Sequence, residues 1–156
     1  MHSNEATQFS DAEPRLSYVI GRVERVLRRR ITAAVEPSGL TLPAYTALSV
    51  LRVQDGLSNA QLARRSFVTP QSMSEVLALL VERGYVRRRP EPGHGRVIRM
   101  ELTKAGSRAL DRCDLAVDDL EREMLAGLDA DEASDLRDVL IRCGRALDFD
   151  LLERTG

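Results

Sequence analysis

Residues 58–89 read SNAQLARRSFVTPQSMSEVLALLVERGYVRRR, and the fold is decided by this stretch. Its first four residues have the form of a capping box. The Ser58 side chain can accept a hydrogen bond from the backbone amide of Gln61, and the Gln61 side chain can reach back to the amide of Ser58. The pattern predicts a short helix over residues 59–65.

A second helix start follows directly. Thr69 is a favourable N-cap, and Pro70 fits the first helical position, where no backbone N–H is needed. Apolar residues then recur at helical spacing as far as Gly84, which is a typical C-terminal stop. The side chains expected to point inward are Met73, Val76, Leu77, Leu80 and Val81.

Beyond Gly84 the apolar residues recur at every second position, as they do in a half-buried strand. Val86 precedes three arginines, and a loop containing proline and glycine covers residues 90–95. This pattern predicts a hairpin with a basic tip. The inward-facing side chains of its second strand are expected to be Ile98, Met100 and Leu102.

Two helices joined by a short turn and followed by a basic hairpin form a winged helix-turn-helix pattern. A helix fits the major groove of DNA, and an arginine-bearing hairpin can reach the adjacent backbone or minor groove. The interpretation is a domain over residues 38–103 that binds double-stranded DNA.

Amphipathic helices flank this domain. Residues 16–36 carry one apolar stripe, Thr41 and Pro43 open a further helix, Thr103 caps another, and residues 129–132 form a second capping box. The fold class is therefore mainly α with a small β-wing. The expected inward residues of the last two helices are Ala109, Leu110, Cys113, Val117, Leu120 and Met124, then Leu136, Val139, Leu140, Cys143 and Leu147.

The flanking stripes exceed what one small domain can cover, so we expect a partner subunit. Residues 15–37 and 104–156 are assigned to a helical region that forms a homodimer. Residues 1–14 are expected to be a flexible tail.

Charge is segregated along the chain although the net charge is only −1. Residues 57–101 sum to +4, whereas residues 102–156 sum to −6. A basic middle segment suits contact with a polyanion, and a solvated surface is the simpler alternative.

Several other classes of protein are disfavoured. The longest apolar run is residues 76–81, which is far shorter than the roughly 20 residues of a membrane helix. With two separated cysteines, no Cys/His zinc pattern and no phosphate loop, we expect a cytoplasmic protein with no cofactor, no metal, no catalytic site and no membrane contact. Asp114 and Asp118 lie one turn apart but lack histidine partners, which favours a solvated face over a metal site.

The residues expected to contact DNA gather in the predicted helix-turn-helix and wing. Gln71 can bind adenine through two hydrogen bonds, Ser72 and Ser74 can reach bases or phosphates, and the arginines can meet the phosphate backbone. For each residue the alternative is a solvated side chain without a role. The full set is Ser58, Asn59, Arg64, Arg65, Thr69, Pro70, Gln71, Ser72, Ser74, Arg87, Arg88, His94 and Arg96.

Four segments of the sequence resemble the MarR family of bacterial transcriptional regulators. They are Gly39-Leu40-Thr41-Leu42-Pro43, Leu62-Ala63, residues 79–88 (LLVERGYVRR) and Leu102-Thr103-Lys104-Ala105-Gly106, and the resemblance covers residues 16–152. It implies an obligate homodimer whose outer helices interlock, with two winged domains on a pseudopalindromic operator. It also implies a regulator, typically a repressor, that is often released from DNA by a small aromatic acid.

The wing departs from the family pattern. Its tip usually carries an Asp-Arg pair, whose arginine enters the minor groove while the aspartate holds the hairpin. Counting back from Leu102, these places are taken by His94 and Gly95, and Arg96 follows. Arg96, His94 or the arginines at 87–89 can take over the contact, or the minor groove matters less here. We favour Arg96, and the alternative is a charge at the strand edge paired with a carboxylate.

Arg15 is the candidate for binding a carboxylate effector, because a guanidinium matches a carboxylate with two parallel hydrogen bonds. Tyr18 and Tyr45 are candidates for ring or hydroxyl contacts. The alternatives are a surface ion pair between Arg15 and Glu13 and ordinary packing of the tyrosines.

Two other functions remain open at this point. The winged helix could serve protein contacts without an operator of its own. Alternatively, Cys113 or Cys143 could sense oxidation, although both occupy apolar-stripe positions where a buried, unreactive thiol is more common.

Overall fold

The computed structural model describes residues 13–147 of the chain. They form a mainly helical structure with one two-stranded antiparallel sheet. In chain order the elements are α1 (Leu16–Val35), η1 (Glu36–Ser38), α2 (Leu42–Val53), α3 (Asn59–Arg65), α4 (Pro70–Glu82), β1 (Val86–Pro90), β2 (Ile98–Leu102), α5 (Lys104–Met124) and α6 (Ala130–Ala146).

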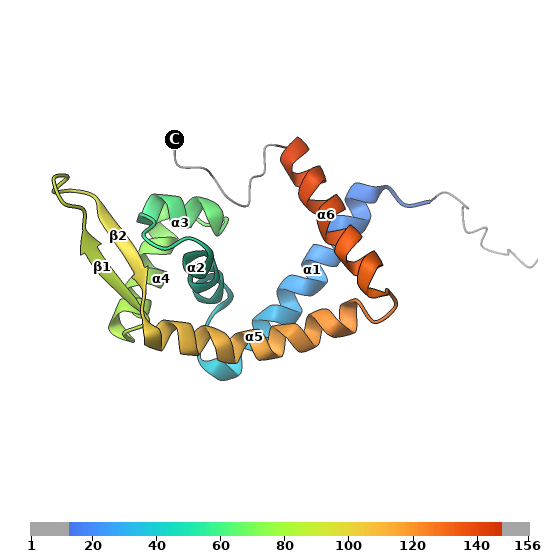
Figure 1. Ribbon diagram of the computed structural model, residues 1–156, viewed down its shortest axis with the longest axis horizontal. Coiled ribbons are helices and arrows are strands. Elements are labelled where there is room, and N and C mark those ends of the chain that lie inside the picture. The colour runs from blue at the N-terminus through green and yellow to red at the C-terminus, as the bar shows by residue number, and fades with distance from the viewer. Residues whose placement is uncertain (1–12, 148–156) are drawn as a thin grey trace, which may run out of the picture.

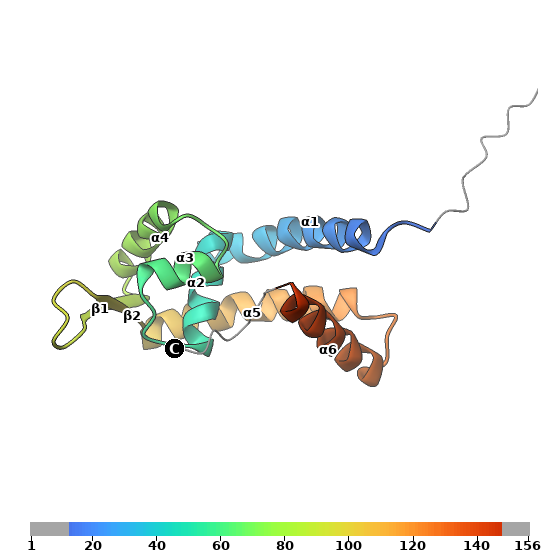
Figure 2. The same cartoon turned by 90° about the horizontal axis from the view of Figure 1, so that it is seen from above.

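The molecule is elongated, with the helix-turn-helix and wing at one end. Figure 1 shows α2, α3, α4 and the hairpin gathered at that end, while α1 and α5 extend from it and α6 follows at the far end. Seen from above in Figure 2, α1 and α5 run along the long axis and α1 packs against α5. The predicted fold class is confirmed.

The predicted helix starts are also confirmed by their cap hydrogen bonds. Ser58 Oγ accepts from the Gln61 amide at 3.3 Å, and the Ser58 amide donates to Gln61 Oε1 at 2.9 Å. Thr69 Oγ1 accepts from the Ser72 amide at 3.1 Å, and Asp129 forms the second capping box with Glu132. These caps satisfy backbone donors that the helices leave free at their N-termini.

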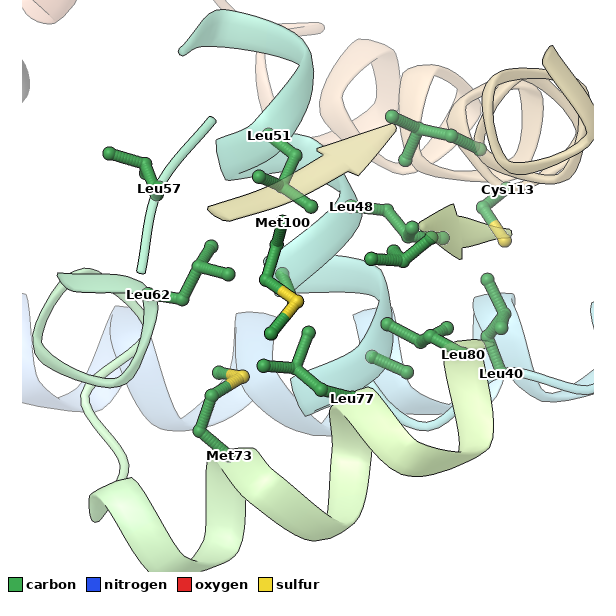
Figure 3. Packing of buried hydrophobic residues seen from close by; sticks show 14 of the residues in the cluster. Leu40, Leu48, Leu51, Leu57, Leu62, Met73, Leu77, Leu80, Met100 and Cys113 are labelled. Atoms are coloured by element: carbon green, nitrogen blue, oxygen red, sulfur yellow. The ribbon is translucent and has the colours of Figure 1, made fainter. Parts of the chain in front are cut away.

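The core lies where α2, α3, α4, α5 and the start of the wing meet. Figure 3 shows side chains from these elements converging on one cluster. Burying one leucine contributes about 1.5–3 kcal/mol, so this cluster is the main source of stability at this end of the molecule. The side chains with the least exposure include Leu48, Leu51, Leu57, Leu62, Met73, Leu77 and Leu80.

Some predicted positions need correction. The loop of the wing begins after Pro90, which belongs to β1, and Ile98 is 43% exposed because it pairs with Pro90 at the distal end of the hairpin, beyond the core. Met124 is also exposed, since it lies at the end of α5 farthest from the core. In this single chain the predicted inward residues of α6 are not buried either, because no described element covers that face: Leu136, Val139, Leu140, Cys143 and Leu147.

Residues 1–12 and 148–156 lie outside the described residues, so most of the expected N-terminal tail and the last part of the expected dimer region are not covered. Between residues 13 and 147, none of the helices combines the length and the apolar character that crossing a membrane requires.

A close backbone approach joins the wing to α5 at Gly106. Thr103 Oγ1 accepts from the Gly106 amide at 3.0 Å and donates to the Gly84 carbonyl at 2.6 Å. A Cβ atom at Gly106 would lie 2.1 Å from the carbonyl oxygen of Tyr85, a distance that no side chain can adopt without moving the backbone. The start of α5 therefore requires glycine at this position.

We expect Gly106→Ala to destabilise the protein by about 2 kcal/mol, because the added methyl group forces the wing and α5 apart. Urea denaturation at one fixed protein concentration measures this. Gly95→Ala is the matched control, since no atom lies within 4 Å of the corresponding Cβ position. Equal stability of the two variants would contradict the close-approach argument.

Candidate nucleic-acid interface

A groove of about 780 Å³ separates the wing from the N-terminal ends of α3 and α4. Its floor is apolar and includes Leu77 and Met100, while polar and charged side chains line its walls. Several residues predicted to bind DNA therefore share one surface feature. They are Ser58, Asn59, Pro70, Ser74, Arg88 and Arg96.

The first turn of α4 projects Gln71 outward. Thr69 Oγ1 and Ser72 Oγ are hydrogen-bonded to each other at 3.0 Å, and Ser74 Oγ donates to the Pro70 carbonyl at 3.0 Å. Gln71 is exposed and makes no side-chain hydrogen bond to any described residue. It is therefore the side chain of this turn most free to form hydrogen bonds with a base.

The predicted contacts at the start of α3 also have an internal role. Asn59 Nδ2 donates to Ser74 Oγ at 2.6 Å and to the Pro70 carbonyl at 3.2 Å, while Ser58 is engaged in its capping box. These bonds fix the start of α3 against the first turn of α4. The buried Asn59 Oδ1 has no hydrogen-bond partner among residues 13–147.

The two arginines that end α3 differ in their surroundings. Arg65 is half-buried, and its Nη1 donates to Gln54 Oε1 at 2.6 Å, so it joins α3 to the end of α2. Arg64 is exposed at the same end of the helix. Of the two, Arg64 is better placed for a contact with phosphate.

Carboxylates pair with most of the arginines on the wing strands. Glu101 binds Arg87 at 2.5 Å and Arg89 at 2.6 Å. The hydrogen bond from Arg87 holds the pKa of Glu101 below its usual value, so the carboxylate is ionised at neutral pH. Arg87 was predicted to contact DNA, and its pairing with Glu101 was not predicted. The pairing follows from the antiparallel register, which places Glu101 directly opposite Arg87.

Arg99 on β2 is a further residue of the wing, and it was not among the residues predicted to form the interface. It binds Glu91 at 2.9 Å and donates to Gln61 Oε1 at 3.3 Å. Because Gln61 belongs to the capping box of α3, Arg99 joins strand β2 of the wing to the helix-turn-helix. This tie positions the wing relative to α4.

Arg88, His94 and Arg96 remain exposed on the wing. Arg88 and Arg96 line the groove, and neither forms an ion pair with a described residue, whereas His94 lies in the turn at the wing tip. The alternative considered for Arg96 was a charge at the strand edge that pairs with a carboxylate. Arg99, which binds Glu91, fits that description, whereas Arg96 does not.

The three candidates for effector binding are not brought together within one chain. Arg15 occupies the N-cap position at the exposed start of α1, where its side chain makes no cap hydrogen bond and no ion pair to Glu13. Tyr18 is 59% exposed beside Arg22. Tyr45 instead packs against the core from α2, which lies beside the opposite end of α1 from Arg15 (Figure 1). A cleft that combines Arg15 with Tyr45 would need Arg15 from a second copy.

Tyr45 belongs to a polar network between α2 and α5. Its hydroxyl donates to Asp114 at 2.9 Å, and Arg52 binds both Asp114 at 2.9 Å and Asp111 at 2.8 Å. Burial, together with the hydrogen bond to Asp114, raises the pKa of Tyr45. These contacts hold α2 against α5, and they occupy Asp114, one of the two aspartates weighed as a metal site. The described residues contain no cluster of three or more metal-binding side chains.

The cysteines lie in different environments. Cys113 is buried in the core, and burial raises the pKa of its thiol, which lowers the fraction of reactive thiolate. Cys143 is exposed on α6 in this chain. The oxidation-sensing alternative is therefore disfavoured at Cys113.

Comparison with known proteins agrees with this geometry. A family model described as MarR family matches residues 38–97. The chain is 37% identical over 129 residues to the HTH-type transcriptional repressor Rv2887 of Mycobacterium tuberculosis, an alignment that covers 83% of this chain and 93% of the relative.

Solved structures give the same result. Rv2887 in complex with DNA superposes with a TM-score of 0.70 at 35% identity, covering 85% of this chain and 99% of that one. Rv2887 in complex with p-aminosalicylic acid gives 0.71 at 35% identity, covering 84% and 99%. Wild-type MarR from Escherichia coli gives 0.74 at 25% identity, covering 85% and 98%. The chain belongs to the MarR family.

Proposed function

We propose that this protein is a dimeric transcriptional regulator, acting as a repressor, that binds a pseudopalindromic operator and is released by a small aromatic carboxylate. The observation that carries the proposal is the exposed first turn of α4 beside a groove lined by Arg88 and Arg96. A repressor relative that has been solved with DNA supports it. In this role the protein acts in the cytoplasm, where the chromosome lies, and it catalyses no reaction.

Uncovered apolar faces on the outer helices support the dimer. Leu16 and Val23 on α1 are 69% and 46% exposed, and Leu140 on α6 is 47% exposed. A second copy would bury these faces, with residues 15–37 and 104–156 forming the dimer region and residues 38–103 the DNA-binding domain. Two-fold symmetry would place the two α4 helices about 34 Å apart, one turn of the duplex.

The effector class is supported by a relative of this chain. Rv2887 has been solved with salicylic acid as well as with p-aminosalicylic acid, and both compounds carry a carboxylate on an aromatic ring. Arg15 can bind such a carboxylate, and Tyr18 and Tyr45 can contact the ring. In this proposal Arg15 and Tyr18 reach the cleft beside Tyr45 from the opposite protomer.

The test is fluorescence-anisotropy titration of a labelled duplex taken from the DNA upstream of the gene. It is run at several salt concentrations with unlabelled competitor DNA, with and without salicylate. Competitor-resistant binding that salicylate weakens supports the proposal. Binding that disappears with competitor or at modest salt shows that the tested duplex does not contain the operator. That result favours a winged helix used for protein contacts.

We expect Gln71→Ala and Arg64→Ala to affect binding differently. Loss of a base contact costs about 1–3 kcal/mol and relaxes the preference at one operator position. Loss of a phosphate contact weakens all sequences alike and lowers the salt slope by about one. Selection of binding sites from a random duplex library measures the sequence preference, and anisotropy titration at several salt concentrations measures the slope. Identical selected sequences for Gln71→Ala and the unaltered protein would refute the base contact.

We expect Arg15→Ala to retain DNA binding and to lose release by salicylate, because the guanidinium that pairs with the carboxylate is removed. The measurement is the salicylate concentration that halves operator binding, with a rise of about tenfold or more expected for the loss of one charged pair. Arg25→Ala, which removes another exposed arginine of α1, is the control. Full release in Arg15→Ala would exclude Arg15 from the site.

A further inference from the structure

Glu101 is the most enclosed charged side chain in the ion pairs of the wing. It is 14% exposed, whereas Arg87 and Arg89, which it binds at 2.5 and 2.6 Å, are 72% and 60% exposed. One carboxylate therefore holds two guanidinium groups on one face of the hairpin. An arginine that meets a phosphate while it stays bound to Glu101 shares its charge with that carboxylate, so it brings less net positive charge to the DNA than an unpaired arginine does.

The opposite face of the hairpin carries a different kind of arginine. Arg88 is the cross-strand neighbour of Met100 and alternates with Arg87 and Arg89, so it lies on the side of the groove. Arg96 reaches the same groove from the loop. Among the ion pairs of the described residues, none involves Arg88 or Arg96.

We propose that Glu101 is a specificity-determining residue of the wing, which holds Arg87 and Arg89 away from DNA and leaves the phosphate backbone to Arg88 and Arg96 in the groove beside α4. This inference rests on the proposed DNA-binding function. Contacts with phosphate strengthen binding to every sequence, because they release counterions without reading bases. Restraining two arginines therefore lowers the affinity for arbitrary DNA while the base contacts of α4 are unchanged.

The decisive variant is Glu101→Gln, which keeps the shape of the side chain and removes its charge. The two released arginines can then meet phosphates, and each new contact steepens the dependence of log K on log salt by about 0.9. If a contact contributes only counterion release, binding to an arbitrary duplex strengthens roughly eightfold per contact at 0.1 M salt. Anisotropy titration of a duplex of arbitrary sequence at four salt concentrations measures both quantities.

Two controls separate release of the arginines from a simple change in net charge. Glu121→Gln removes an exposed carboxylate on α5 and should leave the slope unchanged. In a chain that already carries Arg87→Gln and Arg89→Gln, the further change Glu101→Gln should no longer steepen the slope. A gain that persists in this background would overturn the proposal.

A second pair of variants tests the inference without altering Glu101. Arg88→Gln should lower the salt slope by about 0.9, whereas Arg87→Gln, whose arginine is already paired, should leave it unchanged. Equal effects of the two substitutions would overturn the proposal even if Glu101→Gln failed to fold.

The outcomes also distinguish this inference from the proposed function. If the unaltered protein binds no duplex at any salt concentration, the DNA-binding function itself fails. If the unaltered protein binds duplex DNA and a folded Glu101→Gln variant binds no more tightly, only the role of Glu101 fails. Thermal unfolding followed by circular dichroism shows whether each variant is folded.

Discussion

Burial of one face of α4 is the constraint on which the rest of this end of the molecule depends. Met73, Leu77 and Leu80 are almost fully enclosed by side chains from α2, α3, α5 and β2. Since these positions repeat at helical spacing, burying them turns the opposite face of the helix to solvent. That exposed face begins with Gln71. The packing of the core therefore also determines that the first turn of α4 is exposed to solvent.

Polar contacts then orient the parts around α4. Asn59 ties the start of α3 to the first turn of α4, Arg99 ties the wing to the α3 capping box, and Arg52 ties α2 to α5. Each contact joins two different elements of the fold. The contacts of Asn59 and Arg99 fix the wing, α3 and α4 as one surface, which a contact with a stiff duplex requires.

The pattern of short signals made most of the fold predictable. The signals are local: capping boxes, an N-cap followed by proline, and the change in spacing of apolar residues from a helical repeat to every second residue. Local hydrogen bonding decides where helices and strands begin. Ser58 with Gln61, Thr69 with Pro70, and Thr103 all start helices as predicted. The placement of Ile98 and of the α6 stripe was less predictable, because burial depends on which other element arrives to cover a side chain.

The sequence by itself determined the elements, their order and the surface-forming residues of α4, because these follow from spacing and capping within a few residues. Only the tertiary structure decided which arginines are paired. Arg87, Arg88 and Arg89 are identical residues in the sequence. Strand alternation and the register with β2 place Arg87 and Arg89 beside Glu101, whereas Arg88 points toward the groove. Ion pairing depends on distances between groups that meet only after the chain has folded, so composition and local pattern could not reveal it.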